Sequence, residues 1–277
     1  MKQAKKLFFI TLAITFTLTL FSCSTKNQST AEARFSTLQT QLNSITSSPQ
    51  QLSAKNDDIT VTLHHMIVEP NQLILNYTIS GSDENLVQSI GCSPFITNKS
   101  SFDSSNPTTI GIASSMEKNG TTMLMHNIVV CQYDSKIFSQ NDVGSDISLR
   151  FSSCNGKMSA LYIDGTITDI YTPNTINICQ ELPYNGGSLT VLGLTQHSCY
   201  TEITADLDVS LNEFIFPQLY DANGNQLNIL AGNSMDYSSF WYMPIPQDSD
   251  RLQLEVAQAQ KDGSYKVLSD RIAVTFP

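Results

Sequence analysis

Alternation of apolar and polar residues is the main pattern of the chain beyond residue 57. Over residues 59–67 the mostly apolar set Ile59, Val61, Leu63, His65 and Ile67 alternates with Thr60, Thr62, His64 and Met66, and apolar side chains again occupy every second position over residues 73–79. A period of two is typical of a strand that buries one face. Glu69-Pro70-Asn71 separates the two runs and is a turn signal. The pattern therefore predicts two strands joined by a tight turn.

Similar short runs continue to the end of the chain. We expect further strands at residues 121–131, 147–152, 158–171, 188–192, 199–211, 214–220, 239–243, 251–259 and 265–276. Residues 81–120 are rich in Ser, Asn, Gly and Pro and read mostly as loop, and Asn119-Gly120 is a hairpin-type turn signal. Short strands at this spacing favour β-sandwiches over α/β folds.

Turn-forming residues suggest how the chain divides into domains. Thr172-Pro173-Asn174 and the Pro-, Asn- and Gly-containing residues 182–187 bracket a boundary. We predict an all-β protein with two immunoglobulin-like β-sandwich domains, residues 57–183 and residues 184–277. Both sizes are ordinary for domains.

The polar segment of residues 23–56 precedes these domains. Phe35, Leu38, Leu42 and Ile45 recur there at steps of three and four, which is the spacing of one helix face. A helix of about three turns is marginal unless it docks on other structure. We interpret the segment as a tether with a short helix.

Residues 1–22 have the layout of a secretory signal peptide. Three lysines precede an apolar run over residues 7–21, which is too short for a comfortable membrane span of about 20 residues. Leu20-Phe21-Ser22-Cys23 resembles the lipobox of bacterial lipoproteins, although Phe21 is bulkier than the residue usual at its position. The resemblance implies a diacylglycerol on Cys23 and cleavage just before it. An uncleaved signal anchor and ordinary secretion are the alternatives.

Lipidation of Cys23 would set both the location and the charge of the mature chain. Two acyl chains hold a protein stably on a membrane, whereas one chain holds it only marginally. Cleavage after residue 22 removes three lysines and leaves 12 basic against 25 acidic residues, a net charge of −13. Such a charge disfavours nucleic-acid binding, because phosphates repel it. We expect a lipid-anchored protein of the cell membrane that faces outside the cytoplasm.

Five cysteines follow Cys23, and an exported location permits disulfides between them. Proximity in sequence suggests the pairs Cys92–Cys131 and Cys179–Cys199, although spacing does not fix connectivity. An odd number leaves at least one thiol, here Cys154, that stays free or pairs with another chain. The alternative is that several are buried small apolar residues.

Two parts of the chain resemble known surface proteins. The paired-strand pattern of Ile59–Leu63 with Asn71–Ile79 resembles extracytoplasmic domains of unknown function in Firmicutes surface proteins, which are often attached to membrane anti-sigma factors. The stretch from Ser188 to Leu227 is similar to the immunoglobulin-like domain that commonly follows them. Only six residues precede the apolar run, so we do not expect this chain to hold a sigma factor itself.

No candidate catalytic or metal site carries a complete motif, and we expect neither an enzyme nor a cofactor. Ser115-x-x-Lys118 fits the nucleophile motif of penicillin-binding enzymes, but Asn119-Gly120 would break its helix and the partner motifs are absent. The histidines are His64, His65, His126 and His197. The first two are adjacent in a strand and should point to opposite faces, and none has a standard zinc spacing.

Two further segments have a functional and a structural interpretation. Asp221-Ala222-Asn223-Gly224-Asn225 has oxygen ligands at alternate positions but lacks the terminal glutamate of a calcium loop, so we favour a turn. Phe240-Trp241-Tyr242 could form an exposed binding surface, although core positions are commoner for such a run and we favour the core for Trp241.

The sequence thus favours a non-enzymatic lipoprotein that binds an envelope or membrane protein as a sensory accessory. The alternative is a lipoprotein that binds an envelope polymer or glycan, and exposed aromatic residues near Trp241 would favour it.

Overall fold

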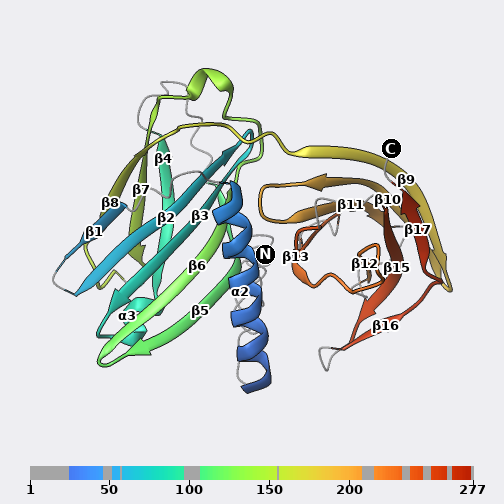
Figure 1. Ribbon diagram of the computed structural model, residues 1–277, viewed down its shortest axis with the longest axis horizontal. Coiled ribbons are helices and arrows are strands. Elements are labelled where there is room, and N and C mark those ends of the chain that lie inside the picture. The colour runs from blue at the N-terminus through green and yellow to red at the C-terminus, as the bar shows by residue number, and fades with distance from the viewer. Residues whose placement is uncertain are drawn as a thin grey trace, which may run out of the picture.

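The computed structural model describes residues 25–45, 52–56, 58–96, 107–154, 156–207, 215–232, 238–245, 251–260 and 264–275. Within these ranges the chain is mostly β, as the alternation predicted, and its strands form several antiparallel sheets. Two β modules lie side by side, and helix α2 lies between them (Figure 1). Among these residues no helix combines the length and the apolar character that a membrane span requires.

The first module comprises residues 52–166. One sheet has the order β1-β2-β3-β6-β5 and the other the order β4-β7-β8. The strands are β1 (Leu52–Lys55), β2 (Ile59–Glu69), β3 (Gln72–Gly81), β4 (Ile90–Ile96), β5 (Thr108–Asn119), β6 (Thr122–Gln132), β7 (Asp146–Ser153) and β8 (Leu161–Thr166). Short helices α3 (Glu84–Gln88) and η2 (Gln140–Asp142) connect some of them. Alternate residues of the two sheets enclose one apolar core, in which the rings of Tyr77 and Phe151 meet edge to face.

The second module comprises residues 174–275. Its larger sheet has the order β13-β14-β11-β10-β9, and in its smaller sheet β15 pairs with β12, β16 and β17. The strands are β9 (Asn174–Tyr184), β10 (Gly187–Gln196), β11 (Thr201–Leu207), β12 (Ile215–Tyr220), β13 (Ile229–Gly232), β14 (Ser239–Tyr242), β15 (Arg251–Ala259), β16 (Tyr265–Val267) and β17 (Ile272–Thr275). A separate apolar core fills this module.

Sheet pairing moves both predicted domain boundaries. Residues 174–183, which we assigned to the first domain, belong to β9, which pairs with β10 of the second module. Residues 52–55, which we assigned to the tether, form β1 and pair with β2. The alternation of apolar and polar residues did not predict β1 and β9, because each is an edge strand that pairs with one other strand and buries few side chains.

The prediction of a loop over residues 81–120 was wrong. This stretch contains α3, β4 and β5. β5 is the edge strand of its sheet, and several of its side chains remain exposed. Exposed strand residues need not be apolar, so the period of two is weak there. Conversely, the strand predicted over 158–171 is limited to β8.

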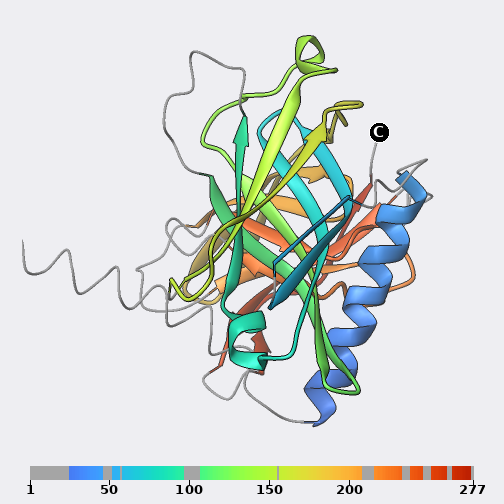
Figure 2. The ribbon, with the colours of Figure 1, turned by 90° about the vertical axis from the view of Figure 1, so that its left-hand side faces the viewer.

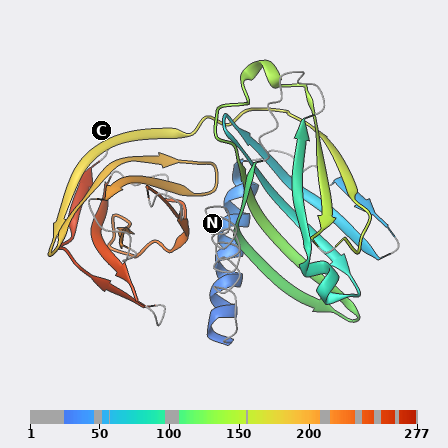
Figure 3. The ribbon, with the colours of Figure 1, turned by 180° about the vertical axis from the view of Figure 1, so that it is seen from behind.

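Helix α2 (Thr25–Ile45) is longer than the three turns that the sequence predicted. The predicted apolar face is correct, because Phe35, Leu38 and Leu42 are all buried. These side chains pack with residues of both modules, so α2 belongs to the folded body and is not a free tether. Seen from behind, α2 again lies between the modules (Figure 3), and seen from the side it runs along one edge of the molecule (Figure 2).

Candidate functional site at the contact between the modules

Two hairpin turns, one from each module, meet at the contact. The β2–β3 turn at Pro70-Asn71 is the turn predicted from the sequence, and it leaves Glu69 and Gln72 as the last facing pair of their strands. Proline pre-sets the backbone for the second position of such a turn. The β10–β11 connection closes when the amide of His197 donates to the carbonyl oxygen of Tyr200 at 2.9 Å. The site consists of the polar side chains that these turns bring together.

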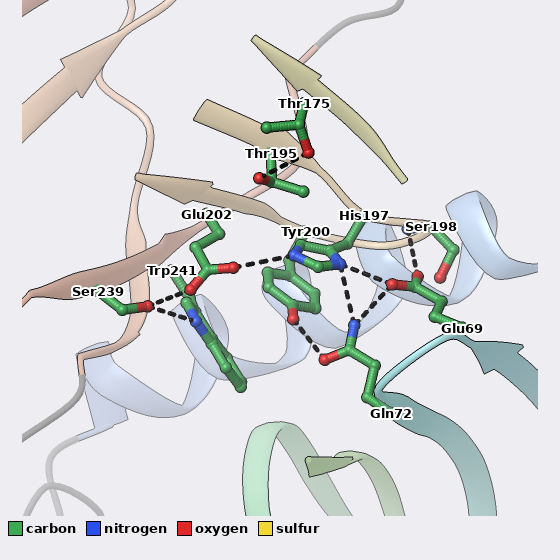
Figure 4. Close-up of polar contacts among 10 residues, drawn as sticks. All are labelled: Glu69, Gln72, Thr175, Thr195, His197, Ser198, Tyr200, Glu202, Ser239 and Trp241. Carbon is green, nitrogen blue, oxygen red and sulfur yellow. Dashed lines mark hydrogen bonds and ion pairs between the residues drawn. The ribbon is translucent and has the colours of Figure 1, made fainter. Parts of the chain in front are cut away.

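His197 lies between two carboxylates. Its Nδ1 is 2.6 Å from Glu69 Oε2, and its Nε2 is 3.1 Å from Glu202 Oε2 (Figure 4). Glu69 belongs to the first module and Glu202 to the second, so the imidazole joins the modules directly. The ring can donate to both carboxylates only in its doubly protonated form, which carries a positive charge.

The surroundings favour this charged form. Burial alone would lower the pKa of His197, but the hydrogen bonds and negative charges of Glu202 and Glu69 outweigh it and raise the pKa to about 9. Burial would also raise the pKa of Glu202, yet the hydrogen bonds from His197 and Ser239 and the imidazolium charge lower it. The cluster is therefore a buried ion triple at neutral pH.

Further donors satisfy the remaining oxygens of the cluster. Ser198 N donates to Glu69 Oε1 at 2.9 Å, and Gln72 Nε2 donates to Glu69 Oε2 at 2.7 Å. The Tyr200 hydroxyl donates to Gln72 Oε1 at 2.8 Å. On the other side, Ser239 Oγ donates to Glu202 Oε1, and Trp241 Nε1 donates to Ser239 Oγ (Figure 4). Buried charges are stable only when such partners surround them.

Apolar residues seal the cluster from one side. The His197 ring stacks on Tyr200 with centroids 4.3 Å apart, and Tyr200 lies 4.6 Å from Trp241. Tyr200 and Trp241 belong to one apolar cluster with the buried residues of α2 and the outer face of the β2–β3–β6–β5 sheet; its members are Phe35, Leu38, Leu42, Ile67, Ile74, Ile112, Ala113, Ile128, Val130, Cys199, Tyr200 and Trp241. The contact between the modules thus has an apolar part and an ionic part.

The chain between the modules is also fixed at this place. Tyr171 N donates to the carbonyl oxygen of Val68 at 2.8 Å, and the Tyr171 ring packs against the apolar cluster. Gln41 Nε2 of α2 reaches the carbonyl oxygen of Ser198 at 3.5 Å. Helix, linker and both turns therefore converge on one region, and this arrangement favours a clamp between the modules.

The arrangement does not suit acid–base catalysis. A general base needs an unprotonated nitrogen or oxygen facing a substrate. Both nitrogens of His197 are engaged with carboxylates, and both carboxylates accept hydrogen bonds from the protein. The chemistry available to the cluster is the gain or loss of a proton that joins or separates the modules.

We predict that alkaline pH weakens this clamp. Because the folded pKa of His197 is raised from 6.5 to about 9, its contribution to stability is complete below pH 6.5 and is lost as the pH rises through 9. By the same linkage, Glu202 contributes above its ordinary pKa and its contribution is lost in acid. The free energy of unfolding of the wild type should exceed that of His197→Gln by an amount that falls by on the order of 3 kcal/mol between about pH 6 and about pH 10. Urea denaturation across that range measures the difference, and a constant difference would contradict the prediction.

The other three histidines lie on the outer face of the first module. A β-bulge between Leu63 and His65 leaves His64 unpaired. His64 Nε2 is 2.7 Å from Thr78 Oγ1, and His65 Nδ1 is 3.3 Å from Asn76 Nδ2. Thr78 and Asn76 are two apart on β3 and share a face. The prediction that His64 and His65 point to opposite faces was therefore wrong, because the bulge shifts the alternation.

His126 lies on the same outer face of the sheet as His64 and His65, but the three histidines are not placed as a metal site. Thr78 Oγ1 is also 2.8 Å from His126 Nδ1, and the His126 ring lies 5.7 Å from that of Phe35. Within the part of the chain that the structure describes, no group of three or more potential ligands is placed to hold a metal ion. These histidines instead lie on the face of the sheet that packs against α2, where His126 contacts Phe35.

The proposed aromatic binding surface is buried. Phe240 and Tyr242 have no exposed surface and Trp241 retains 3%. Phe240 and Tyr242 enter the core of the second module, whereas Trp241 on the opposite face enters the cluster at the contact. The core interpretation of Trp241 is confirmed, and the three residues do not form a surface.

Two further motifs also have structural roles. Ser115 and Lys118 lie in β5, where residues three apart point to opposite faces, so they cannot form a nucleophile and its base. Asp221 Oδ1 accepts hydrogen bonds from the amides of Asn223 and Asn225, as the turn interpretation predicted.

All five cysteines after Cys23 are free thiols in the structure. Cys92 and Cys131 share the core of the first module, but the predicted pair Cys179–Cys199 is separated, since Cys179 is exposed on β9 and Cys199 is buried at the contact. Burial raises the pKa of Cys92, Cys131 and Cys199, which makes them unreactive.

We therefore expect a two-step thiol titration. Cys154 and Cys179 should react with a maleimide in the native protein, whereas Cys92, Cys131 and Cys199 should react only after denaturation. Peptide mass spectrometry without reductant measures this pattern. If a cysteine stays unlabelled after denaturation and is found in a cross-linked peptide, the corresponding predicted disulfide is present in the protein.

Comparisons with known proteins identify a fold but no family. No protein-family model matches the sequence, and no curated protein matches it. A conserved domain protein from Bacillus anthracis is similar in structure, with a TM-score of 0.52 and 10% identity over 82% of this chain and 90% of that one. The ectodomain of mouse nectin-like molecule 4 (TM-score 0.25, 12% identity, 79% of this chain and 65% of that one) and the tandem Ig repeats of Dlar (TM-score 0.22, 11% identity, 79% and 97%) are more distant. The last two scores are too low to assign an immunoglobulin fold.

Sequence reasoning missed the cluster at the contact. The sequence marked His197 only as a histidine without a standard zinc spacing, whereas its structural partner Glu69 is 128 residues distant. The one local signal was the Glu69-Pro70-Asn71 turn, which placed Glu69 at the end of a strand. Nothing in the sequence indicated which turn would face it.

Proposed function

We propose that this protein is an exported lipoprotein of the cell membrane that acts as a non-enzymatic binding or sensory accessory module for an envelope protein. A signal peptide of residues 1–22 would direct export, and a diacylglycerol on Cys23 would anchor the chain outside the cytoplasm. These residues lie outside the described ranges. The two modules would be immunoglobulin-like β-sandwiches, a common architecture for recognition by surface contact.

The packing of α2 carries this proposal. α2 begins two residues after Cys23, and the side chains of Phe35, Leu38 and Leu42 on its apolar face are buried against both modules. The anchored end of the chain is therefore part of the folded body, so the modules would stand in a fixed relation to the membrane. A body held in this way suits a protein that presents its surface to a membrane partner.

A glycan-binding role is the second candidate, and the outer face of the β4-β7-β8 sheet supports it. Tyr162 is 56% exposed and lies directly opposite Arg150, and Asp164 projects from the same face two residues later. An exposed ring beside a cation and a carboxylate can stack on a sugar and hydrogen-bond its hydroxyls. Among the side chains whose exposure the structure describes, Tyr162 is the one exposed aromatic ring on this face, and this ranks glycan binding second.

Cross-linking on living cells tests the two roles. The wild type should incorporate radiolabelled fatty acid and capture one dominant membrane protein, whereas Cys23→Ser should lose both the label and the capture. Mass spectrometry identifies the captured molecules. Unchanged acyl labelling of Cys23→Ser would overturn the anchor, and capture of wall polymer without a consistent protein would favour the glycan-binding role.

A further inference from the structure

Helix α2 runs antiparallel to β5, as two of its contacts show. Near its end, Gln41 reaches Ser198, which itself bonds to Glu69 beside the β2–β3 turn. β5 starts at this level, because Thr108 pairs with Gln132 and Gln132 pairs with Gln72. Earlier in the helix, Phe35 lies against His126, farther along β6 toward the β5–β6 turn. Going back toward Thr25, α2 therefore approaches the β5–β6 turn.

The start of α2 and the β5–β6 turn lie at the same level. Ten residues of helix separate Phe35 from Thr25, which is about 15 Å at 1.5 Å per residue. His126 pairs with Ser115, and four more residues of β5 lead to Asn119, which is about 14 Å. Figures 1 and 2 show both features at the lower end of the molecule.

We propose that this end of the molecule is its membrane-facing surface and that the β5–β6 turn, residues 118–122, lies against the lipid headgroups. The inference rests on the proposed lipidation of Cys23. Thr25 follows Cys23 by two positions, which span at most about 7 Å. The acylated cysteine cannot leave the bilayer surface, so the start of the docked helix α2 and the β5–β6 turn at the same level are held there too.

The chemistry of the turn suits contact with headgroups without insertion. Asn119, Gly120, Thr121 and Thr122 are exposed and uncharged, and Glu117 and Lys118 carry opposite charges. Amide and hydroxyl groups can hydrogen-bond phosphate and carbonyl oxygens of lipids. No apolar side chain in the turn could enter the hydrocarbon, so the acyl chains supply the affinity. A zwitterionic membrane is sufficient for this contact.

The orientation determines which surfaces a partner can reach. The modules lie side by side along α2, so neither is stacked above the other on the anchor (Figure 1). η2 lies at the opposite end of the first module, beyond the 11 residues of β6, which span about 37 Å. A membrane partner that stays close to the bilayer would contact the flanks of both modules, whereas η2 would point into the extracytoplasmic space.

Fluorescence quenching at two matched positions tests the orientation. Asn119→Cys at the β5–β6 turn and Asn141→Cys in η2 replace exposed asparagines at opposite ends, in a background of Cys154→Ser and Cys179→Ser that removes the exposed thiols. Each acylated protein is labelled with a fluorophore and bound to phosphatidylcholine vesicles that contain a headgroup spin label. The label at Asn119→Cys should lose most of its fluorescence, and the label at Asn141→Cys should keep it.

A third variant and the vesicle binding itself separate the possible failures. Leu38→Asp, which should release α2 from the body, should abolish the quenching at Asn119→Cys while the protein stays bound through its lipid. Vesicle binding with equal quenching at both positions, or with stronger quenching at Asn141→Cys, would overturn the orientation and leave the proposed anchor intact. Failure of the wild type to carry lipid and to bind vesicles would overturn the proposed function together with the orientation.

Discussion

His197→Ala is expected to lower the free energy of unfolding by about 3–5 kcal/mol at neutral pH. Glu69 has no exposed surface, and without the imidazolium its charge would be buried with only two hydrogen bonds. Breaking a buried ion pair by removing one partner costs this much because the other charge is left uncompensated. Urea denaturation of the Cys23→Ser protein measures the change. Trp241, the only tryptophan, is buried at this contact and reports on it by fluorescence.

His126→Ala is the matched control for this substitution. His126 also faces a carboxylate, Glu117, at 3.4 Å, but the two side chains are 26% and 64% exposed. Exposed pairs contribute about 1 kcal/mol or less, so this variant should cost clearly less than His197→Ala even though it also removes the Thr78 hydrogen bond and the Phe35 contact. The double variant Glu69→Gln with His197→Gln should lose less than the two single variants together, because it removes both charges at once. Equal effects of His197→Ala and His126→Ala would contradict the ion triple.

Leu38→Asp is expected to detach α2 from the body. Leu38 has no exposed surface and lies in the apolar cluster that joins the helix to both modules. Loss of a buried leucine alone costs about 2–5 kcal/mol, and an unpaired buried charge costs more. An undocked helix of this composition is marginal in water. Amide hydrogen exchange in residues 25–45 should therefore accelerate by at least about 30-fold, the factor that corresponds to 2 kcal/mol.

Thr37→Asp places the same charge on the neighbouring residue of the helix. Thr37 is exposed, and its hydroxyl bonds only within the helix to the carbonyl oxygen of Ala33. Surface substitutions of this kind usually change stability by less than about 0.5 kcal/mol. Exchange in α2 should stay close to that of the wild type. Protection of α2 in Leu38→Asp equal to that in Thr37→Asp would show that the helix does not depend on this packing.

Much of the fold was accessible from local patterns. The strands around Pro70-Asn71 and the turn between them follow from alternation and from the conformational preference of proline. The buried face of α2 follows from the spacing of Phe35, Leu38 and Leu42. The length of α2 could not be predicted in this way, because the flanking Ser, Thr and Gln residues carry no periodic signal. Trp241 was correctly favoured as a buried residue, but the sequence could not indicate which of two cores it would enter.

The errors have a common physical origin in pairing between distant segments. β9 joins the second module because its backbone finds a partner in β10, and β1 joins the first because it pairs with β2. Backbone hydrogen bonds do not depend on side-chain pattern, so these edge strands leave little trace in the sequence. The β-bulge at His64 is a similar case. One extra residue in the strand reverses the side of the sheet that each later side chain was predicted to face.

The sequence by itself determined the strand-rich composition, the main hairpin, the apolar face of the helix and the acidic charge of the chain, because each is a property of neighbouring residues. Only the tertiary structure decided that Glu69 and Glu202 enclose His197 and that the apolar face of α2 packs against both modules. Glu69 and His197 lie 128 residues apart and become neighbours only when two separate turns meet. That meeting depends on the shapes of two folded modules, and no local period in the chain encodes it.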